Sequence, residues 1–218
     1  MPVGKKVAVP NEWRLGEKSI SNTTSYKYLG EVVTNDNKNK KNIEAKENKI
    51  EITIRQINTT ASSDIMRGVE ARVLLILFEK CIIPSLTSNC ESWTLSITDE
   101  RQLDKIGIRA LKRLFGLPTT TPGAAIAYSF GQLYITQEVD KKRFMFLHKV
   151  LSRENDHWTK QMMLHLQAEN LGWAKNITEK LTQYGLETDW EVIRRHSKRQ
   201  WKKISGDAVE KKEQEKDS

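Results

Sequence analysis

Six cationic residues lie close together near the end of the chain, and their type and spacing suit the binding of an anion. No acid separates them, and helical spacing would place them in two adjacent rows. Like charges at this spacing repel one another unless a bound anion neutralises them. The pattern therefore indicates binding of a polyanion such as nucleic acid, and a solvated helix face is the alternative. The rows are Arg194, Lys198 and Lys202, and beside them Arg195, Arg199 and Lys203.

Two further groups of cations fit contacts with phosphates. Such contacts need cations on a rigid apolar scaffold, and they carry no base-sequence information. For any single lysine, a solvated helix face is again the alternative. The first group, near the start of the first predicted helix, is Lys38, Lys40, Lys41, Lys46 and Lys49. The second group is Arg101, Lys105, Arg109, Lys112 and Arg113.

Residues for catalysis are not grouped in a comparable way. Polymerase or nuclease chemistry with Mg²⁺ needs clustered carboxylates, and the sequence has no Asp-Asp pair. The four histidines have no Glu-X-X-His neighbourhood, and no Walker-type loop or Gly-X-Ser-X-Gly elbow occurs. Cys81 and Cys90 flank Pro84 in an apolar setting typical of inert core thiols. We expect no enzyme activity of the isolated chain, no metal site and no cofactor.

Composition agrees with a folded, basic protein. The chain has 218 residues, 38% of them hydrophobic, and its 36 Lys and Arg against 28 Asp and Glu give a net charge of +8. A basic balance suits a polyanionic partner, although many soluble proteins have it without one. No secretory signal follows Met1, and the longest apolar run, Val73 to Phe78, is far too short to span a membrane. An intracellular location, in the nucleus or the cytoplasm, is predicted.

Hydrophobic periodicity predicts a mainly α-helical chain with a small antiparallel β section in residues 1–34. Lys6–Val9, Trp13–Leu15 and Ser25–Val33 have the aromatic and β-branched residues typical of strands. A helix begins near residue 42, with Lys46, Lys49 and Arg55 off its apolar stripe. Asp64 is expected to cap a second helix, which Pro84 ends or kinks. The stripe of the first helix is Ile43, Ile50, Ile54 and Ile57.

More helices are predicted after residue 97. Thr98-Asp99-Glu100 opens one that Gly116 and Pro118 end, and others span about 136–151, 156–169 and 173–184. Thr136 is expected to cap the helix in which Arg143 snorkels. Thr188 and Glu191 form a capping box before the basic helix. The buried positions of the helix that opens at Thr98 are Leu103, Ile106, Ala110, Leu111 and Leu114. Those of the basic helix are Trp190, Ile193, Trp201 and Ile204.

Five collinear segments resemble one family, the LINE-type (non-LTR) retrotransposon reverse transcriptases. The resemblance covers about residues 5–204 and concerns the end of the palm, the thumb and the post-thumb linker. Near Ser88–Cys90 the chain departs from it, because the family has Tyr-Gly there. The segments are Trp13–Ile20 with Tyr26–Gly30, Ile83–Leu86 with Glu91–Leu95, Ile106–Pro118, Lys141–His148, and Trp190–Trp201.

The resemblance implies a division of the chain and a function. Residues 1–34 would be the end of the palm, 35–97 thumb-like helices, 98–204 a helical linker with the basic helix, and 205–218 a disordered tail. The paired catalytic aspartates of the palm, and the Mg²⁺ that they hold, would lie upstream. We therefore expect a truncated RNA-directed DNA polymerase that binds template–primer without polymerising. Its partners would be RNA, RNA–DNA hybrid or DNA, with the missing polymerase and endonuclease parts, and no membrane.

Two other hypotheses remain open. The chain could be a non-catalytic helical interaction module, whose basic helix docks on an acidic protein. It could also be a retroelement remnant that does not fold alone, in which case its exposed strands would aggregate. The salt dependence of binding separates the first of these from nucleic-acid binding, and the solubility of the expressed chain tests the second.

Overall fold

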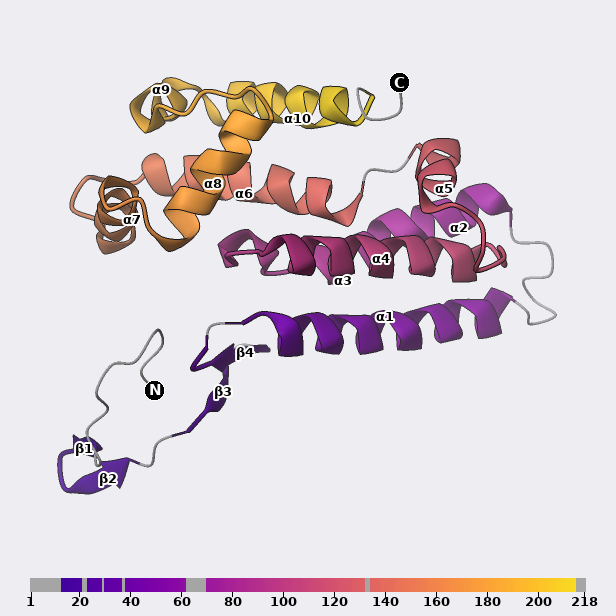
Figure 1. Cartoon of the computed structure of the whole chain (residues 1–218), viewed down its shortest axis with the longest axis horizontal. Coiled ribbons are helices and arrows are strands. Elements are labelled where there is room, and N and C mark those ends of the chain that lie inside the picture. The colour runs from indigo at the N-terminus through magenta and orange to yellow at the C-terminus, as the bar shows by residue number, and fades with distance from the viewer. Residues whose placement is uncertain are drawn as a thin grey trace.

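The computed structural model describes residues 13–20, 23–28, 30–36, 38–61, 70–131 and 134–214. These residues are mainly helical, with short antiparallel strands before the first helix, which confirms the predicted fold class. Four long helices lie one above another from the bottom to the top of Figure 1, and each packs on the next. They are α1 (Lys40–Ala61), α4 (Ile97–Leu114), α6 (Ile135–Leu151) and α10 (Lys198–Gln214).

Within the described residues, the β section consists of two separate hairpins. Strand β1 (Trp13–Leu15) pairs with β2 (Lys18–Ile20), and β3 (Ser25–Tyr28) pairs with β4 (Glu31–Thr34). The second hairpin turns at Gly30, whose φ of +90° favours glycine. Its link to α1 is the Asn42 side chain, which accepts from Val32 N at 2.7 Å and donates to Val32 O at 3.0 Å. The predicted strand at 6–9 lies outside the described residues.

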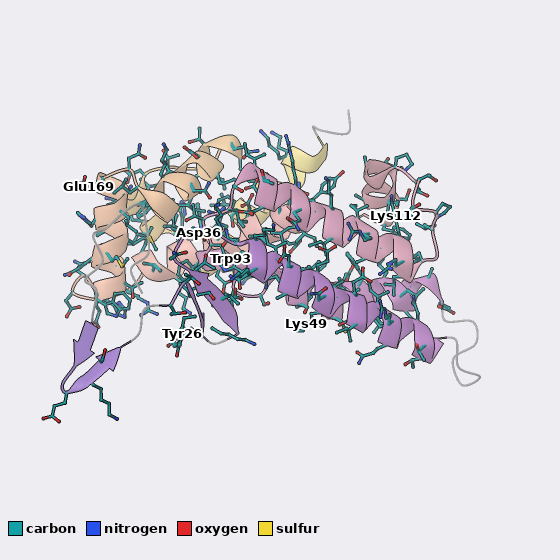
Figure 2. All side chains as sticks on the ribbon, turned by 60° about the horizontal axis from the view of Figure 1, so that its bottom comes forward. Tyr26, Asp36, Lys49, Trp93, Lys112 and Glu169 are labelled. Carbon is teal, nitrogen blue, oxygen red and sulfur yellow. The ribbon has the colours of Figure 1, made fainter. Side chains whose placement is uncertain are left out.

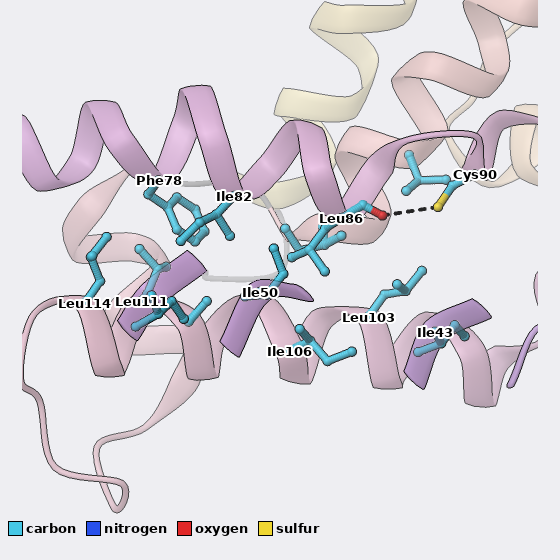
Figure 3. Packing of buried hydrophobic residues seen from close by; sticks show 14 of the residues in the cluster. Ile43, Ile50, Phe78, Ile82, Leu86, Cys90, Leu103, Ile106, Leu111 and Leu114 are labelled. Atoms are coloured by element: carbon cyan, nitrogen blue, oxygen red, sulfur yellow. Dashed lines mark hydrogen bonds between the residues drawn. The ribbon is translucent and has the colours of Figure 1, made fainter. Parts of the chain in front are cut away.

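One hydrophobic core forms between α1, α4 and the helical segment that precedes α4. Figure 3 shows Ile43 and Ile50 of α1 with Leu103 and Ile106 of α4 around this core. The stripes predicted for the two helices are buried, except that Ile57 is only partly buried. Ser96 caps α4 and accepts from Asp99 N, so the helix begins beside the predicted Thr98–Glu100 segment. Hydrophobic periodicity was therefore a good guide to this core.

Pro84 distorts its helix instead of ending it. The segment runs through α2 (Ala71–Leu77), a π-helical turn η1 (Phe78–Ile82) and α3 (Ile83–Thr87). Ile83 N–H bonds to the carbonyl of Phe78, five residues back. A proline has no N–H, and its ring crowds the carbonyl four residues before it, so a wider turn there relieves the clash. The predicted cap Asp64 lies outside the described residues.

A second hydrophobic core lies on the other half of α6. It is built with α7 (Trp158–Ala168), α8 (Gly172–Gln183), α9 (Trp190–Arg195) and α10. Helix α6 thus serves both cores, with Ile135 and Val139 in the first and Phe144 and Leu147 in the second. The first core also includes α5 (Gly123–Phe130), a helix that was not predicted. The 3-10 turn η2 (Cys90–Ser92) lies between α3 and α4.

Three predicted details of the helix ends are wrong. Tyr134, not Thr136, caps α6, and the Thr136 hydroxyl donates to Asp104. Asp189, not Thr188, caps α9, because its carboxylate accepts from Glu191 N at 2.9 Å. The expected tail from residue 205 is helical as far as Gln214, since Ser205 and Val209 are buried and hold that helix in place.

Candidate nucleic-acid interface

The predicted single basic helix is in fact two helices. His196 and Ser197 separate α9 from α10, and His196 is extended, with φ −68° and ψ 143°. Ser197 starts α10, because its hydroxyl accepts from Gln200 N at 3.3 Å while Ser197 N donates to the Gln200 side chain at 2.9 Å. The two predicted rows of cations are therefore broken after Arg195.

Trp201 anchors helix α10 on α6. Trp201 is fully buried, and its indole N–H donates to the carbonyl of Phe144 at 2.9 Å. Ser205 and Val209, one and two turns further on, are buried on the same side of α10. Ile204 was predicted to share this buried arc, but it is 40% exposed. The buried side of α10 therefore follows residues 201, 205 and 209. The orientation of this side toward α6 determines where the cations of α10 point.

A groove of about 1060 Å³ runs between α6 and α10 and is rich in cations. Its acids, Glu91, Glu138, Asp207 and Glu210, are fewer than its cations. Four cations come from α10 and three from α6, namely Lys198, Arg199, Lys202 and Lys203, and Lys141, Lys142 and Lys149. The lining therefore has a positive excess of three charges, which favours an anionic ligand.

Two of the α6 lysines are already engaged with protein groups. Lys141 lies 3.0 Å from Glu210 and 3.5 Å from Glu138. Lys142 donates to the hydroxyl of Thr87 at 2.6 Å. Among the described residues, the structure places no carboxylate within ion-pair distance of the other five cations. These five are Lys149, Lys198, Arg199, Lys202 and Lys203.

The three lysines of α6 were not among the predicted binding residues. A signal was present, because Lys142 and Lys149 are seven residues apart and so lie on one face of a helix. What the spacing did not indicate was that this face lies opposite α10. Of the predicted residues of the basic helix, Arg194 and Arg195 belong to α9 and do not line the groove. Arg194 is 3.6 Å from Glu191.

Two of the five cations in the second predicted group, on α4, are neutralised by acids of α1. Arg109 forms an ion pair with Glu47, and Arg113 forms one with Glu51. Lys112 donates to the carbonyl of Thr119 at 2.7 Å. These side chains tie α1 and the following loop to α4, so they hold the fold together. Arg101 and Lys105 stay exposed, away from the α6–α10 groove.

The first predicted group, on and before α1, is divided between surface and interior. Lys38 is 3.5 Å from Asp36, and the Thr34 hydroxyl that donates to Asp36 lowers the pKa of that carboxyl. Lys40 lies 3.9 Å from Glu44. Lys41 is exposed. The exposed Lys49 projects from the side of α1 that faces away from α4 (Figure 2). These exposed cations are spread along one helix and do not converge on a groove.

Lys46 is a correction to the predicted site. It is only 7% exposed, and its ammonium donates to the Ser88 carbonyl at 2.7 Å and to the Ser88 hydroxyl at 2.9 Å. It also lies 5.1 Å from the centre of the Trp93 ring. Lys46 follows Ile43 by three residues and precedes Ile50 by four, so it lies on the buried stripe of α1 and not off it. It is unavailable to a phosphate.

Arg143 also differs from the prediction, because it does not snorkel to solvent. Its side chain is fully buried, 3.4 Å from Asp140, and it donates to the Asn176 side chain. The guanidinium lies 5.8 Å from the centre of the Trp173 ring. Burial lowers the pKa of Arg143, and Asp140 opposes that effect. Arg143 thus stabilises the interior of the second core and cannot contact an external ligand.

Comparisons of the chain with protein-family models, with curated proteins and with solved structures found no match. Among the described residues, no group of three or more His, Cys, Asp or Glu side chains could hold a metal ion. In the same part of the chain, no helix is both long and apolar enough to cross a membrane. The geometry of the α6–α10 groove is therefore the main guide to function.

Proposed function

We propose that this chain binds the phosphate backbone of RNA, RNA–DNA hybrid or DNA along the α6–α10 groove and does not itself polymerise. The observation that carries the proposal is the excess of cations in that groove, five of them without a carboxylate partner among the described residues. Cations held on packed helices bind phosphates and release counterions, which makes binding strong at low salt and weak at high salt. The resemblance to the thumb region of LINE-type reverse transcriptases agrees with this role.

The geometry favours backbone contacts over reading of base sequence within the groove. Lys and Arg side chains dominate its charged lining, and cations on phosphates set position without specifying bases. Polymerisation is not proposed, because two-metal chemistry needs clustered carboxylates and the sequence has no Asp-Asp pair.

A second candidate is docking of an acidic protein segment in the same groove. Met145 and Phe146 lie in its lining and would bury apolar side chains of such a partner. Apolar contacts resist salt, whereas cation–phosphate contacts weaken steeply as salt rises. The salt dependence of binding therefore decides between the two candidates.

The test is a titration of the purified chain against labelled single-stranded RNA and RNA–DNA hybrid by fluorescence anisotropy. If the five unpaired cations of the groove each neutralise one phosphate of a single strand, the slope of log affinity against log salt is about −3.5. Affinity for the single strand should then fall about 100-fold between about 50 mM and about 200 mM salt. A folded chain that binds neither ligand at the lower salt would overturn the proposal.

Charge reversal locates the bound strand. Lys203→Glu should weaken binding and reduce the slope by about 0.7 for a single strand, because one phosphate contact is lost. Lys211→Glu is the matched control, since Lys211 is an exposed cation of the same helix that does not line the groove. If both variants weaken binding equally, net charge and not the groove is responsible.

A further inference from the structure

A second cavity, of about 480 Å³, adjoins the basic groove. It lies between the β3–β4 hairpin, the start of α1 and the 3-10 turn η2. Glu91 and Phe146 line both cavities, so the two are neighbours. Its volume is in the range of small-ligand pockets. A chain bound along the groove would reach it directly.

The second cavity differs in chemistry from the basic groove. Its one cation is Lys38, which already lies 3.5 Å from Asp36. Aromatic and amide side chains take the place of the lysines, with Tyr28 61% exposed and Trp93 buried. Figure 2 shows Trp93 inside the molecule, close to the start of α1 and the β3–β4 hairpin. Aromatic faces and amides suit the flat, polar-edged shape of a nucleobase.

Carboxylates make this cavity unfavourable for a phosphate group. Glu31 and Glu91 both line it. Asn89 donates to one carboxylate oxygen of Glu31 at 3.3 Å, while the other, Oε2, is buried and has no hydrogen-bond partner among the described residues. Glu31 thus has one donor among the described residues, and a ligand in the cavity that brings an N–H group would give its carboxylate a second. The missing element at Glu31 is therefore a donor, not an anion.

We propose that this cavity receives one unpaired nucleobase with an exocyclic amino group, from a single strand whose phosphates lie on the α6–α10 groove. The inference rests on the proposed function and adds a base-selective subsite to it. Tyr28 would stack on the base, and Glu31 would accept from its amino group. Uracil presents a carbonyl where cytosine has the amino group, so it would place an acceptor against the Glu31 carboxylate.

The experiment compares oligocytidine with oligouridine of equal length by fluorescence anisotropy, with the full chain. Oligocytidine should bind about tenfold more tightly, as expected for one good contact with a base edge. Glu31→Gln should remove this preference, because a glutamine amide can donate to the uracil carbonyl. The substitution changes only an oxygen to a nitrogen, so the shape of the cavity is kept.

Two tyrosines of β3 provide a matched pair for the stacking contact. Tyr28→Ala should weaken binding of oligocytidine about tenfold, and Tyr28→Phe should keep it, because only the ring face is used. Tyr26→Ala is the control, since Tyr26 is 60% exposed on the same strand, two residues away, and does not line the cavity.

The outcomes separate this inference from the proposed function. Equal binding of the two oligonucleotides, with a steep salt dependence, would overturn the base subsite and leave the groove proposal standing. Equal effects of Tyr26→Ala and Tyr28→Ala would also overturn it. Absence of binding to both oligonucleotides, with the chain folded, would remove the proposed function and the subsite together. A preference for cytidine that Glu31→Gln abolishes supports the subsite.

Discussion

Asp140 and Arg143 of α6 are buried together, yet their partners are distributed unequally. Asp140 also accepts from the Tyr184 hydroxyl at 3.1 Å and lies 3.5 Å from the ammonium of Lys180. Arg143 has Asp140 and the Asn176 side chain, while its Nε has no hydrogen-bond partner in the described part of the chain. Removal of one member of the pair is therefore predicted to have a different effect from removal of the other.

Asp140→Asn should be the more damaging substitution. It leaves the Arg143 guanidinium buried without a carboxylate, and breaking a buried pair in this way lowers the free energy of unfolding by about 3–5 kcal/mol. Arg143→Met leaves Asp140 with Lys180 and Tyr184 and fills much of the same space. The loss is then closer to that of a hydrogen bond to a charged group, about 2 kcal/mol. Lys180 is supported in either variant by Glu100 at 2.7 Å.

Urea unfolding followed by far-UV circular dichroism measures both losses. The double variant Asp140→Asn with Arg143→Met should be more stable than Asp140→Asn alone, because it removes the unpaired buried cation. The slope of the free energy against urea should stay constant across the variants if the folded state is unchanged. The reasoning fails if Arg143→Met is as damaging as Asp140→Asn, or if the double variant is the least stable of the three.

Two more predictions concern buried side chains. Burial raises the pKa of the Cys90 thiol to about 12, so at pH 8 it stays protonated and unreactive, whereas the exposed Cys81 should react. Iodoacetamide should modify one thiol in the native chain and both in urea, and rapid modification of both in the native chain would contradict the burial of Cys90. Trp201→Phe loses the indole hydrogen bond to Phe144 and some volume, and should lower the free energy of unfolding by about 1–3 kcal/mol. An unchanged urea midpoint would mean that Trp201 does not anchor α10.

Local periodicity predicted most of the first core. The isoleucines of α1 and the leucines of α4 repeat at helical spacing, and they pack against each other in the first core (Figure 3). The end of α4 was also predictable, because glycine commonly follows the last turn of a helix. Gly116 does so here and adopts a φ of +63°, in the left-handed region that favours glycine. Such signals depend on a few neighbouring residues, so they can be found without the tertiary structure.

The errors arose where a tertiary contact overrides the residue type. Lys46 and Arg143 carry charges, yet both are buried because nearby groups compensate the charge. For Lys46 these are the Ser88 carbonyl and the Trp93 ring, and for Arg143 the Asp140 carboxylate. Their spacing from buried isoleucine or valine indicated the inner face, while their chemistry indicated the surface. Position was the better guide for these two residues. Lys46 is bound by Ser88, far away in the sequence, and Arg143 by Asn176 of α8 as well as by Asp140 of its own helix.

The candidate groove was only half visible in the sequence, for a related reason. Helical spacing indicates which side chains share a face, but it does not indicate which two faces meet. The cations of α4 and those of α10 looked alike as patterns, and their environments differ. Glu47 and Glu51 of α1 answer Arg109 and Arg113, whereas α10 lies opposite the lysines of α6. Arg101 and Lys105 of α4 stay exposed as well, but the α6–α10 groove gathers seven cations against four acids, which is why the binding proposal rests on α10 and not on α4.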